Sequence, residues 1–148
     1  MAIFVNENTK VIVQGLTGGQ GKYHGLRNRD YGTQVVAGVT PGKAGQDVDG
    51  IPIFDSVADA VAATGATASF VAVPPKFASD AILEAAAAGI GFVVCITEGI
   101  PAQDEARTYN LLVRNHPNTR LLGPNCPGII SPGKCNIGIT AGQIAQVP

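Results

Sequence analysis

The sequence predicts a Rossmann-like α/β domain, with a doubly wound, mainly parallel sheet and helices on both faces. Short runs rich in Val, Ile and Phe alternate with longer segments rich in Ala, in which apolar residues recur at helical spacing. The short runs are continuously apolar, as is typical of strands that are covered on both faces. Because right-handed crossovers place successive strands side by side, this repeated alternation predicts a parallel sheet.

Each predicted element follows from a local pattern. Strands are predicted at residues 10–16, 34–40, 68–74, 91–97 and 119–125. Helices are predicted at residues 18–32, 56–65, 75–89 and 101–117. Ser56 is placed to cap the second helix, and Gly65 and Gly89 stand where the second and third helices end. The face of the third helix expected to pack on the sheet holds Phe77, Ala81, Ile82 and Ala85.

Beyond residue 125 the sequence becomes rich in Pro and Gly, and only short strands are predicted, at Gly128–Ser131 and Cys135–Ile139. We therefore expect a ligand-binding domain over residues 1–130. Residues 131–148 are expected to form the short strands and the start of a linker to a further domain.

Composition narrows the classes of function. With 148 residues, 45% of them hydrophobic and 14% charged, the chain is sized for one domain with a substantial core. A net charge of −1 provides no field for a nucleic acid or an anionic membrane, so a small ligand or a protein partner is expected. No apolar stretch reaches the ~18 residues of a membrane span, and no signal peptide is recognisable, which predicts a cytoplasmic protein.

Cysteine and histidine usage argues against a metal site. The three cysteines include no C-x-x-C pair, and the two histidines, His24 and His116, lie far apart in the sequence. The cysteine count suits a reducing compartment.

The stretch "VIVQGLTGGQG" follows the first predicted strand directly and contains a G-x-x-G-x-x-G pattern at Gly15, Gly18 and Gly21. Without Cβ atoms, backbone N–H groups can approach a phosphate, and the positive end of the following helix favours an anion. Thr17 adds a hydroxyl and Gln20 an amide. The alternative is that the glycines only make a tight turn and a close contact between helix and sheet.

The loop after the second strand indicates which nucleotide is bound. An NAD site expects an acidic residue there, but none occurs between Gln34 and Gln46, and Lys43 stands in the loop instead. A lysine favours a ligand with an additional ribose phosphate, such as NADP or coenzyme A. The alternative reading is a solvated loop lysine.

Two further predicted strands end at the same edge. Pro74 and Pro75 follow the third strand, where they either form a rigid wall for an adenine ring or simply begin a helix. Ile96, Thr97 and Glu98 follow the fourth. A buried Thr and Glu would need partners, so a ligand or a neighbouring loop is expected to satisfy them.

A stiff loop, "GPNCPG", follows the fifth predicted strand and holds Asn125 and Cys126 between two prolines. Cys126 raises the possibility of a nucleophile. Because no Asp and His arrangement is available to activate it, we expect a structural or ligand-contacting thiol.

Together the segments "VTPGK", "ITEGIP" and "GPNCPG", with the glycine loop, resemble the amino-terminal domain of the alpha subunit of succinyl-CoA synthetase (succinate–CoA ligase). The resemblance runs through almost the whole chain in the same order. It implies a Rossmann-like domain that binds coenzyme A. The whole enzyme of the tricarboxylic acid cycle joins succinate and CoA with hydrolysis of ATP or GTP, by way of succinyl phosphate and a phosphorylated histidine.

The resemblance also implies site residues. The implied CoA contacts are Thr17, Gly18, Gly19, Gln20, Lys43, Ile96, Thr97 and Glu98. Pro74 with Ile96 would frame the nucleotide portion of CoA, and Asn125 and Cys126 would lie near its thiol end.

The family's phosphorylated histidine and succinate-binding residues belong to a second alpha-subunit domain, and neither His24 nor His116 matches that histidine. The resemblance therefore implies that this chain supplies the CoA site, contains no catalytic residue and is inactive alone. The implied partners are the missing catalytic domain and the beta subunit, which holds the nucleotide, with Mg²⁺ acting only in the full complex. The location would be the bacterial cytoplasm, or the mitochondrial matrix for a eukaryotic chain.

Two alternatives remain open from the sequence. One is an NAD(P)-dependent oxidoreductase domain, against which the missing acidic residue argues. The other is a free-standing CoA-binding regulatory protein of similar fold. The identity of the acid and the choice between ATP and GTP also stay open, because the residues that decide them lie outside this chain.

Overall fold

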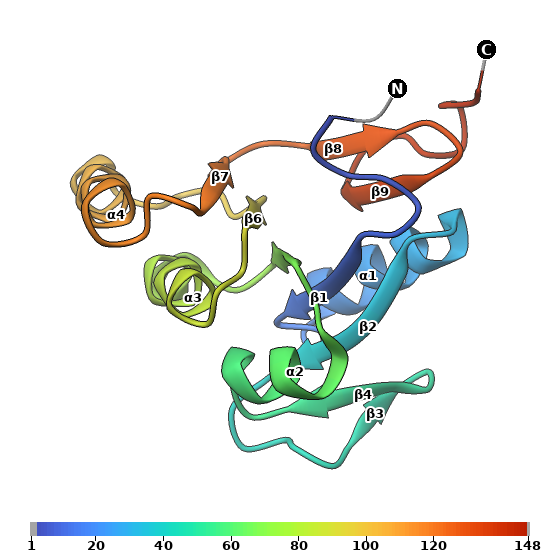
Figure 1. The fold of residues 1–148 in the computed structure, drawn as a ribbon, viewed down its shortest axis with the longest axis horizontal. Helices are drawn as coiled ribbons and strands as arrows, with labels where there is room; N and C mark the ends of the chain where they lie inside the picture. Colours follow the sequence, from blue (N-terminus) through green and yellow to red (C-terminus); the bar gives the residue numbers. More distant parts are fainter. Residues whose placement is uncertain (1–2, 148) are drawn as a thin grey trace.

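The computed structural model describes residues 3–147, which form an α/β domain around a seven-stranded sheet (Figure 1). The strands of the sheet are β1 (Lys10–Gln14), β2 (Gln34–Val39), β3 (Asp47–Val48), β4 (Ile51–Phe54), β5 (Ala68–Val71), β6 (Phe92–Cys95) and β7 (Arg120–Leu122). The helices are α1 (Gly19–Tyr31), α2 (Val57–Thr64), α3 (Pro75–Ala87) and α4 (Ala102–Asn115). A separate antiparallel hairpin follows, formed by β8 (Gly128–Ser131) and β9 (Cys135–Gly138).

The strand order β3-β4-β2-β1-β5-β6-β7 confirms the predicted doubly wound sheet. All pairings are parallel except that of β3 with β4. The chain runs outward from β1 through β2 to β4 and then returns to place β5 on the other side of β1. This reversal at β1 and β5 is the switch point at which ligands bind in open α/β sheets.

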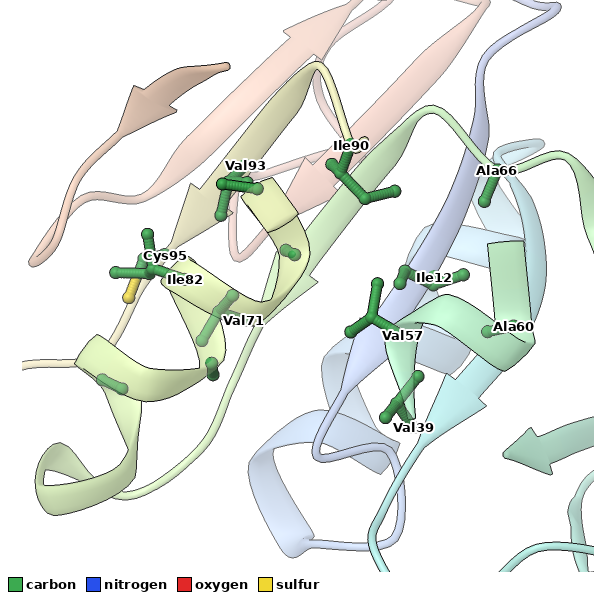
Figure 2. Packing of buried hydrophobic residues seen from close by; sticks show 14 of the residues in the cluster. Ile12, Val39, Val57, Ala60, Ala66, Val71, Ile82, Ile90, Val93 and Cys95 are labelled. Atoms are coloured by element: carbon green, nitrogen blue, oxygen red, sulfur yellow. The ribbon is translucent and has the colours of Figure 1, made fainter. Parts of the chain in front are cut away.

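Two hydrophobic cores lie on the two faces of the sheet, because successive strand residues point in opposite directions. Ile12 of β1 packs in the core beneath α2, α3 and α4, where Figure 2 shows it close to Val57. Its neighbours Val11 and Val13 belong to the opposite core with Phe70. Fully burying each such side chain contributes about 1.5 to 3 kcal/mol, so continuously apolar strands stabilise both layers at once.

Local signals placed most of the elements correctly. All five predicted strands and all four predicted helices are present, and so is the β8–β9 hairpin. The Ser56 hydroxyl accepts the backbone N–H of Asp59 at 3.1 Å, as expected of an N-cap, and Gly65 ends α2 with a left-handed φ of 73°.

The sequence reading missed the edge of the sheet formed by β3 and β4. Ile51 and Ile53 of β4 are buried, whereas Pro52 between them is exposed. This alternation is typical of a half-covered strand and differs from the continuous runs that identified the others. Pro52 is tolerated because β4 pairs with β2 only through Ile53 and Phe54.

Two expectations about helix faces are wrong. α1 has no apolar stripe: its buried residues are Gly21, Gly25 and Asn28. In α3 the buried face uses Ala78, whereas Phe77 is 52% exposed. Small residues on α1 let that helix approach the sheet closely, and Phe77 lies on the surface of α3.

Buried polar side chains of α1 and the loop after it fasten β9 to the domain. The amide of Asn28 accepts the N–H of Gly138 at 3.0 Å and donates to its carbonyl at 2.9 Å. Thr33 makes the same pair of contacts with Asn136, each at 2.8 Å. β9 also contributes Cys135 and Ile137 to the core shared with β1. The hairpin therefore packs as part of the sheet domain, and the linker assigned to the residues after it stays a prediction.

We expect Asn28→Ala to lower the free energy of unfolding by about 2 to 4 kcal/mol, because both backbone groups of Gly138 would lose their partner in a buried position. Urea denaturation of the two proteins measures this difference. Asn110→Ala on the exposed side of α4 is the matched control and is expected to change stability by less than about 0.5 kcal/mol. Equal stability of the Asn28 and Asn110 variants would contradict a stabilising role for the hydrogen bonds between Asn28 and Gly138.

Candidate functional site

The candidate site is a groove at the carboxyl ends of β1, β2, β5 and β6, at the switch point of the sheet. It consists of two adjoining hollows that share Gly18, Ala72, Val73 and Pro74. The hollow toward β2, here called the β2 hollow, has a volume of about 540 Å³. The hollow toward β6, the β6 hollow, has a volume of about 480 Å³.

The glycines of the loop occupy two kinds of position. Gly15 has a left-handed φ of 95°, and a Cβ there would lie 2.8 Å from the carbonyl oxygen of Ala72. A Cβ on Gly21 would overlap the carbonyl of Gly15. Gly15 and Gly21 therefore make the tight turn and close packing that the sequence left as an alternative. At Gly19 a Cβ would meet no protein atom within 4 Å, and Gly19 lines the β6 hollow.

The N-terminus of α1 opens onto this groove. Gly18 is its N-cap and supplies no side-chain hydrogen bond, and the first turn contains no acidic residue. The first N–H groups of a helix have no partner within the helix and carry a partial positive charge. An uncapped N-terminus of this kind is suited to a phosphate.

Polar side chains beside the loop are held in place by neighbours. The hydroxyls of Thr17 and Thr40 lie 3.0 Å apart and join the loops that follow β1 and β2. Gln20 Oε1 lies 3.0 Å from Nε2 of His24, one turn along α1. Burial lowers the pKa of His24, and the positive charge of Arg27 lowers it further. The imidazole is therefore held toward its neutral form, in which it supports Gln20.

Gln14 closes the floor of the β2 hollow. The side chain is 2% exposed, its Nε2 donates to the carbonyl of Ala81 at 2.9 Å, and its Oε1 accepts from the Ser69 hydroxyl at 2.6 Å. These bonds connect β1 to β5 and to α3 at the end of the sheet where the groove lies.

The segment after β6 lines the β6 hollow with Ile96, Thr97 and Glu98. Thr97 is buried, and its hydroxyl donates to the carbonyl of Val73 at 2.8 Å, so a neighbouring loop satisfies it. The expected burial of Glu98 is wrong, because that side chain is exposed and needs no partner. Its carboxylate makes no hydrogen bond or ion pair with residues 3–147.

The structure confirms one of the two alternatives for Pro74 and Pro75, the start of a helix. Pro75 is the first residue of α3, where its missing N–H costs nothing. Pro74 lines both hollows, and the wall for an adenine ring stays a prediction.

Lys43 lies outside both hollows on an exposed loop whose backbone is fixed. The carboxylate of Asp55 accepts the N–H groups of Gly42 and Ala44, at 2.9 and 3.2 Å, on either side of it. The loop passes the β2 hollow at Thr40 and Pro41. The backbone that carries the exposed Lys43 is thus held near the groove.

Asn125 and Cys126 do not line either hollow. The N–H of Asn125 donates to the carbonyl of Thr97 at 3.0 Å, and the Cys126 thiol donates to the carbonyl of Cys95 at 3.3 Å. The loop therefore holds the end of β6 and the segment after it in place through these hydrogen bonds. Burial raises the pKa of Cys126, although the N–H of Gly128 partly opposes this. A neutral thiol agrees with a structural residue rather than a nucleophile, and contact of this loop with a ligand stays a prediction.

Sequence reasoning missed Pro41, Phe77, Asp80 and Ile139, which also line the groove. Pro41 adjoins Lys43 in "TPGK" and could have been included on that basis. Ile139 follows β9 and reaches the β6 hollow only because the hairpin folds back onto α1, for which the local sequence contains no signal.

Comparison with protein families matches residues 6–99 to the CoA binding domain. The chain belongs to the CoA-binding domain family. The groove described above lies mainly within the matched segment, and its glycine loop, Pro74 and the 96–98 segment are all included.

Similar proteins support the same assignment. The chain is 56% identical to the alpha subunit of succinate–CoA ligase [ADP-forming] of Aquifex aeolicus over 97% of its length, covering 47% of that protein. It is also 56% identical to subunit alpha 2 of the Archaeoglobus fulgidus ligase, of which it covers 50%. These matches confirm the resemblance found in the sequence. The chain spans about half the length of these curated relatives.

Solved structures confirm the fold. An ATP citrate lyase of Methanosaeta concilii, solved with (3S)-citryl-CoA, aligns with a TM-score of 0.76 and 23% identity, over 96% of this chain and 25% of that one. Acetyl-coenzyme A synthetase 1 of Ca. Korarchaeum cryptofilum aligns with a TM-score of 0.72 and 20% identity, over 93% and 31% of the chains. No helix within residues 3–147 has the length and apolar character needed to cross a membrane.

Alanine substitution can distinguish the tightly packed glycines from those that border open space. Gly21→Ala is expected to lower the free energy of unfolding by about 3 kcal/mol, because the new methyl group would collide with backbone. Gly19→Ala is expected to preserve or slightly raise stability, since its Cβ enters open space in a helix. Urea denaturation measures the stability of both variants. Equal stabilities would refute the conclusion that Gly21 is tightly packed and Gly19 borders open space.

Proposed function

We propose that the groove binds coenzyme A and that this chain is the CoA-binding part of the alpha subunit of an acid–CoA ligase, with succinate as the acid. The observation that carries this proposal is that the CoA-binding family match coincides with a groove built on the uncapped N-terminus of α1. The similarity to succinate–CoA ligase alpha subunits over 97% of the chain supports the choice of enzyme.

The two hollows suggest how CoA is arranged. The phosphates would lie at the N-terminus of α1, contacting Gly18, Gly19 and Gln20 with the Thr17 hydroxyl beside them. The adenine would occupy the β2 hollow against the flat surfaces of Pro41, Pro74 and Phe77. Lys43 would approach from the neighbouring loop and pair with the ribose phosphate.

The pantetheine arm would then follow the β6 hollow. Ile96 supplies an apolar contact there, and Thr97 and Glu98 define the outer wall. The thiol would leave this hollow toward the loop of Asn125 and Cys126, where the reaction takes place against another domain. Glu98, which is exposed, would then contact the arm or the neighbouring domain.

In the full reaction, succinate, CoA and ATP or GTP would give succinyl-CoA, ADP or GDP and phosphate. This chain would hold and orient CoA, and the remaining half of the alpha subunit and a beta subunit would supply the phosphoryl carrier, the carboxylate site, the nucleotide and Mg²⁺. The compartment would be the bacterial cytoplasm or the mitochondrial matrix. An oxidoreductase is disfavoured, because Val39, Thr40 and Pro41 stand where an NAD site places an acid after β2.

The first test concerns the ribose phosphate. Lys43→Ala is expected to weaken CoA binding by about 1 to 3 kcal/mol, measured by titration calorimetry, because a charged hydrogen bond would be lost. Dephospho-CoA should bind the parent as weakly as CoA binds the variant. Lys10→Ala, an exposed lysine at the opposite end of β1, is the control and should bind CoA normally. Equal binding of CoA by all three proteins would show that Lys43 does not contact the ribose phosphate. Tighter binding of NAD than of CoA to the parent would overturn the proposal that the groove binds CoA.

The second test concerns the division of the reaction. The chain alone, supplied with succinate, CoA, ATP and Mg²⁺, is expected to form no succinyl-CoA, since phosphoryl transfer depends on positioning groups that lie outside it. Mass spectrometry after incubation with ATP should find no phosphate on His24 or His116. Phosphate on His24 that is lost in His24→Asn would show instead that this chain carries the phosphoryl group itself.

A further inference from the structure

The β2 hollow contains a carboxylate that the arrangement proposed above does not use. Asp80 lies on α3, one turn after Phe77, and lines the hollow together with it. Much of the remaining wall is apolar, including Val39, Pro41 and Val73. An acidic group on such a wall would orient a flat ligand, because apolar contacts alone hold a ring without fixing its rotation.

The other polar side chains that line this hollow are engaged by the protein. They are Gln14, Thr17, Thr40 and Glu84. Gln14 bonds to α3 and β5, and the two threonines bond to each other, as described above. Oε1 of Glu84 accepts the N–H of Val57 at the start of α2. Within residues 3–147, Asp80 makes no hydrogen bond or ion pair, so both of its oxygens are available to a ligand.

We propose that Asp80 accepts a hydrogen bond from the exocyclic amino group of the adenine of CoA and thereby determines which base the hollow selects. The inference rests on the proposed function, which places the base in the β2 hollow. An ionised carboxylate only accepts hydrogen bonds, and the 6-amino group of adenine only donates them, so the two are complementary. A base with an acceptor at that position would meet the carboxylate with the wrong polarity.

The charge of Asp80 also has an opposing effect. CoA is a polyanion, and a carboxylate near it repels the phosphates through solvent, which weakens binding of any CoA analogue. Comparing two ligands with identical phosphates on the same protein removes this long-range contribution. The ratio of their affinities therefore reports the local contact between Asp80 and the base.

The experiment measures binding of CoA and of an analogue in which purine replaces adenine, so that only the 6-amino group is missing. By titration calorimetry the parent chain is expected to prefer CoA by about tenfold, as a charge-assisted hydrogen bond at an exposed site allows. In Asp80→Ala the preference should fall to within about twofold. Asp80→Asn retains a carbonyl acceptor and should recover part of the preference.

Asp30→Ala is the matched control, because Asp30 is an exposed acid near the end of α1 and lies outside the groove. It should keep the tenfold preference. Equal binding of the two ligands by the parent chain, or an unchanged preference in Asp80→Ala, would overturn the inference while leaving CoA binding intact. A parent chain that binds no CoA would instead overturn the proposed function on which the inference rests.

Discussion

The close approach of α1 to the sheet is the constraint on which the rest of the site depends. Gly21 lies directly over the carbonyl of Gly15, and a Cβ on Gly25 would lie 2.9 Å from a methyl group of Leu16. No larger residue fits at either position without moving backbone or core. The helix is therefore held with its uncapped N-terminus at the ends of β1 and β5, where its first N–H groups open onto the groove.

Buried amides and hydroxyls then connect parts of the chain that are far apart in sequence. Gln14 joins β1 to α3 on one side of the sheet. Asn28 and Thr33 join α1 and its following loop to β9 on the other, across more than 100 residues of sequence. Hydrogen bonds of this kind demand particular geometry, because a buried polar group left without a partner is costly. The bonds of Asn28 and Thr33 fix the position of β9 against α1, and Ile139, which follows β9, lines the β6 hollow.

Sequence patterns predicted the interior of the sheet better than its edge and its surface. The central strands are mostly apolar because both faces are covered, and that signal is strong. In β4, at the edge, buried and exposed residues alternate, with Pro52 exposed. This strand therefore lacks the continuous apolar run that identified the others. α1 was expected to bury apolar residues, yet buries Gly21, Gly25 and Asn28, since its closeness to the sheet leaves no space for larger side chains.

For the binding groove, the sequence by itself determined the strand ends that meet at the switch point and the residue types after each of them. The glycine loop, Pro74 and the 96–98 segment followed from this, because the carboxyl ends of parallel strands must share one edge. Only the tertiary structure decided which glycines pack and which line the groove, that Glu98 is exposed, and that Asp80 and Phe77 of α3 line the same hollow as Thr17. Those outcomes depend on the distances between elements. These distances are determined when the helices pack on the sheet, and no local pattern of residues encodes them.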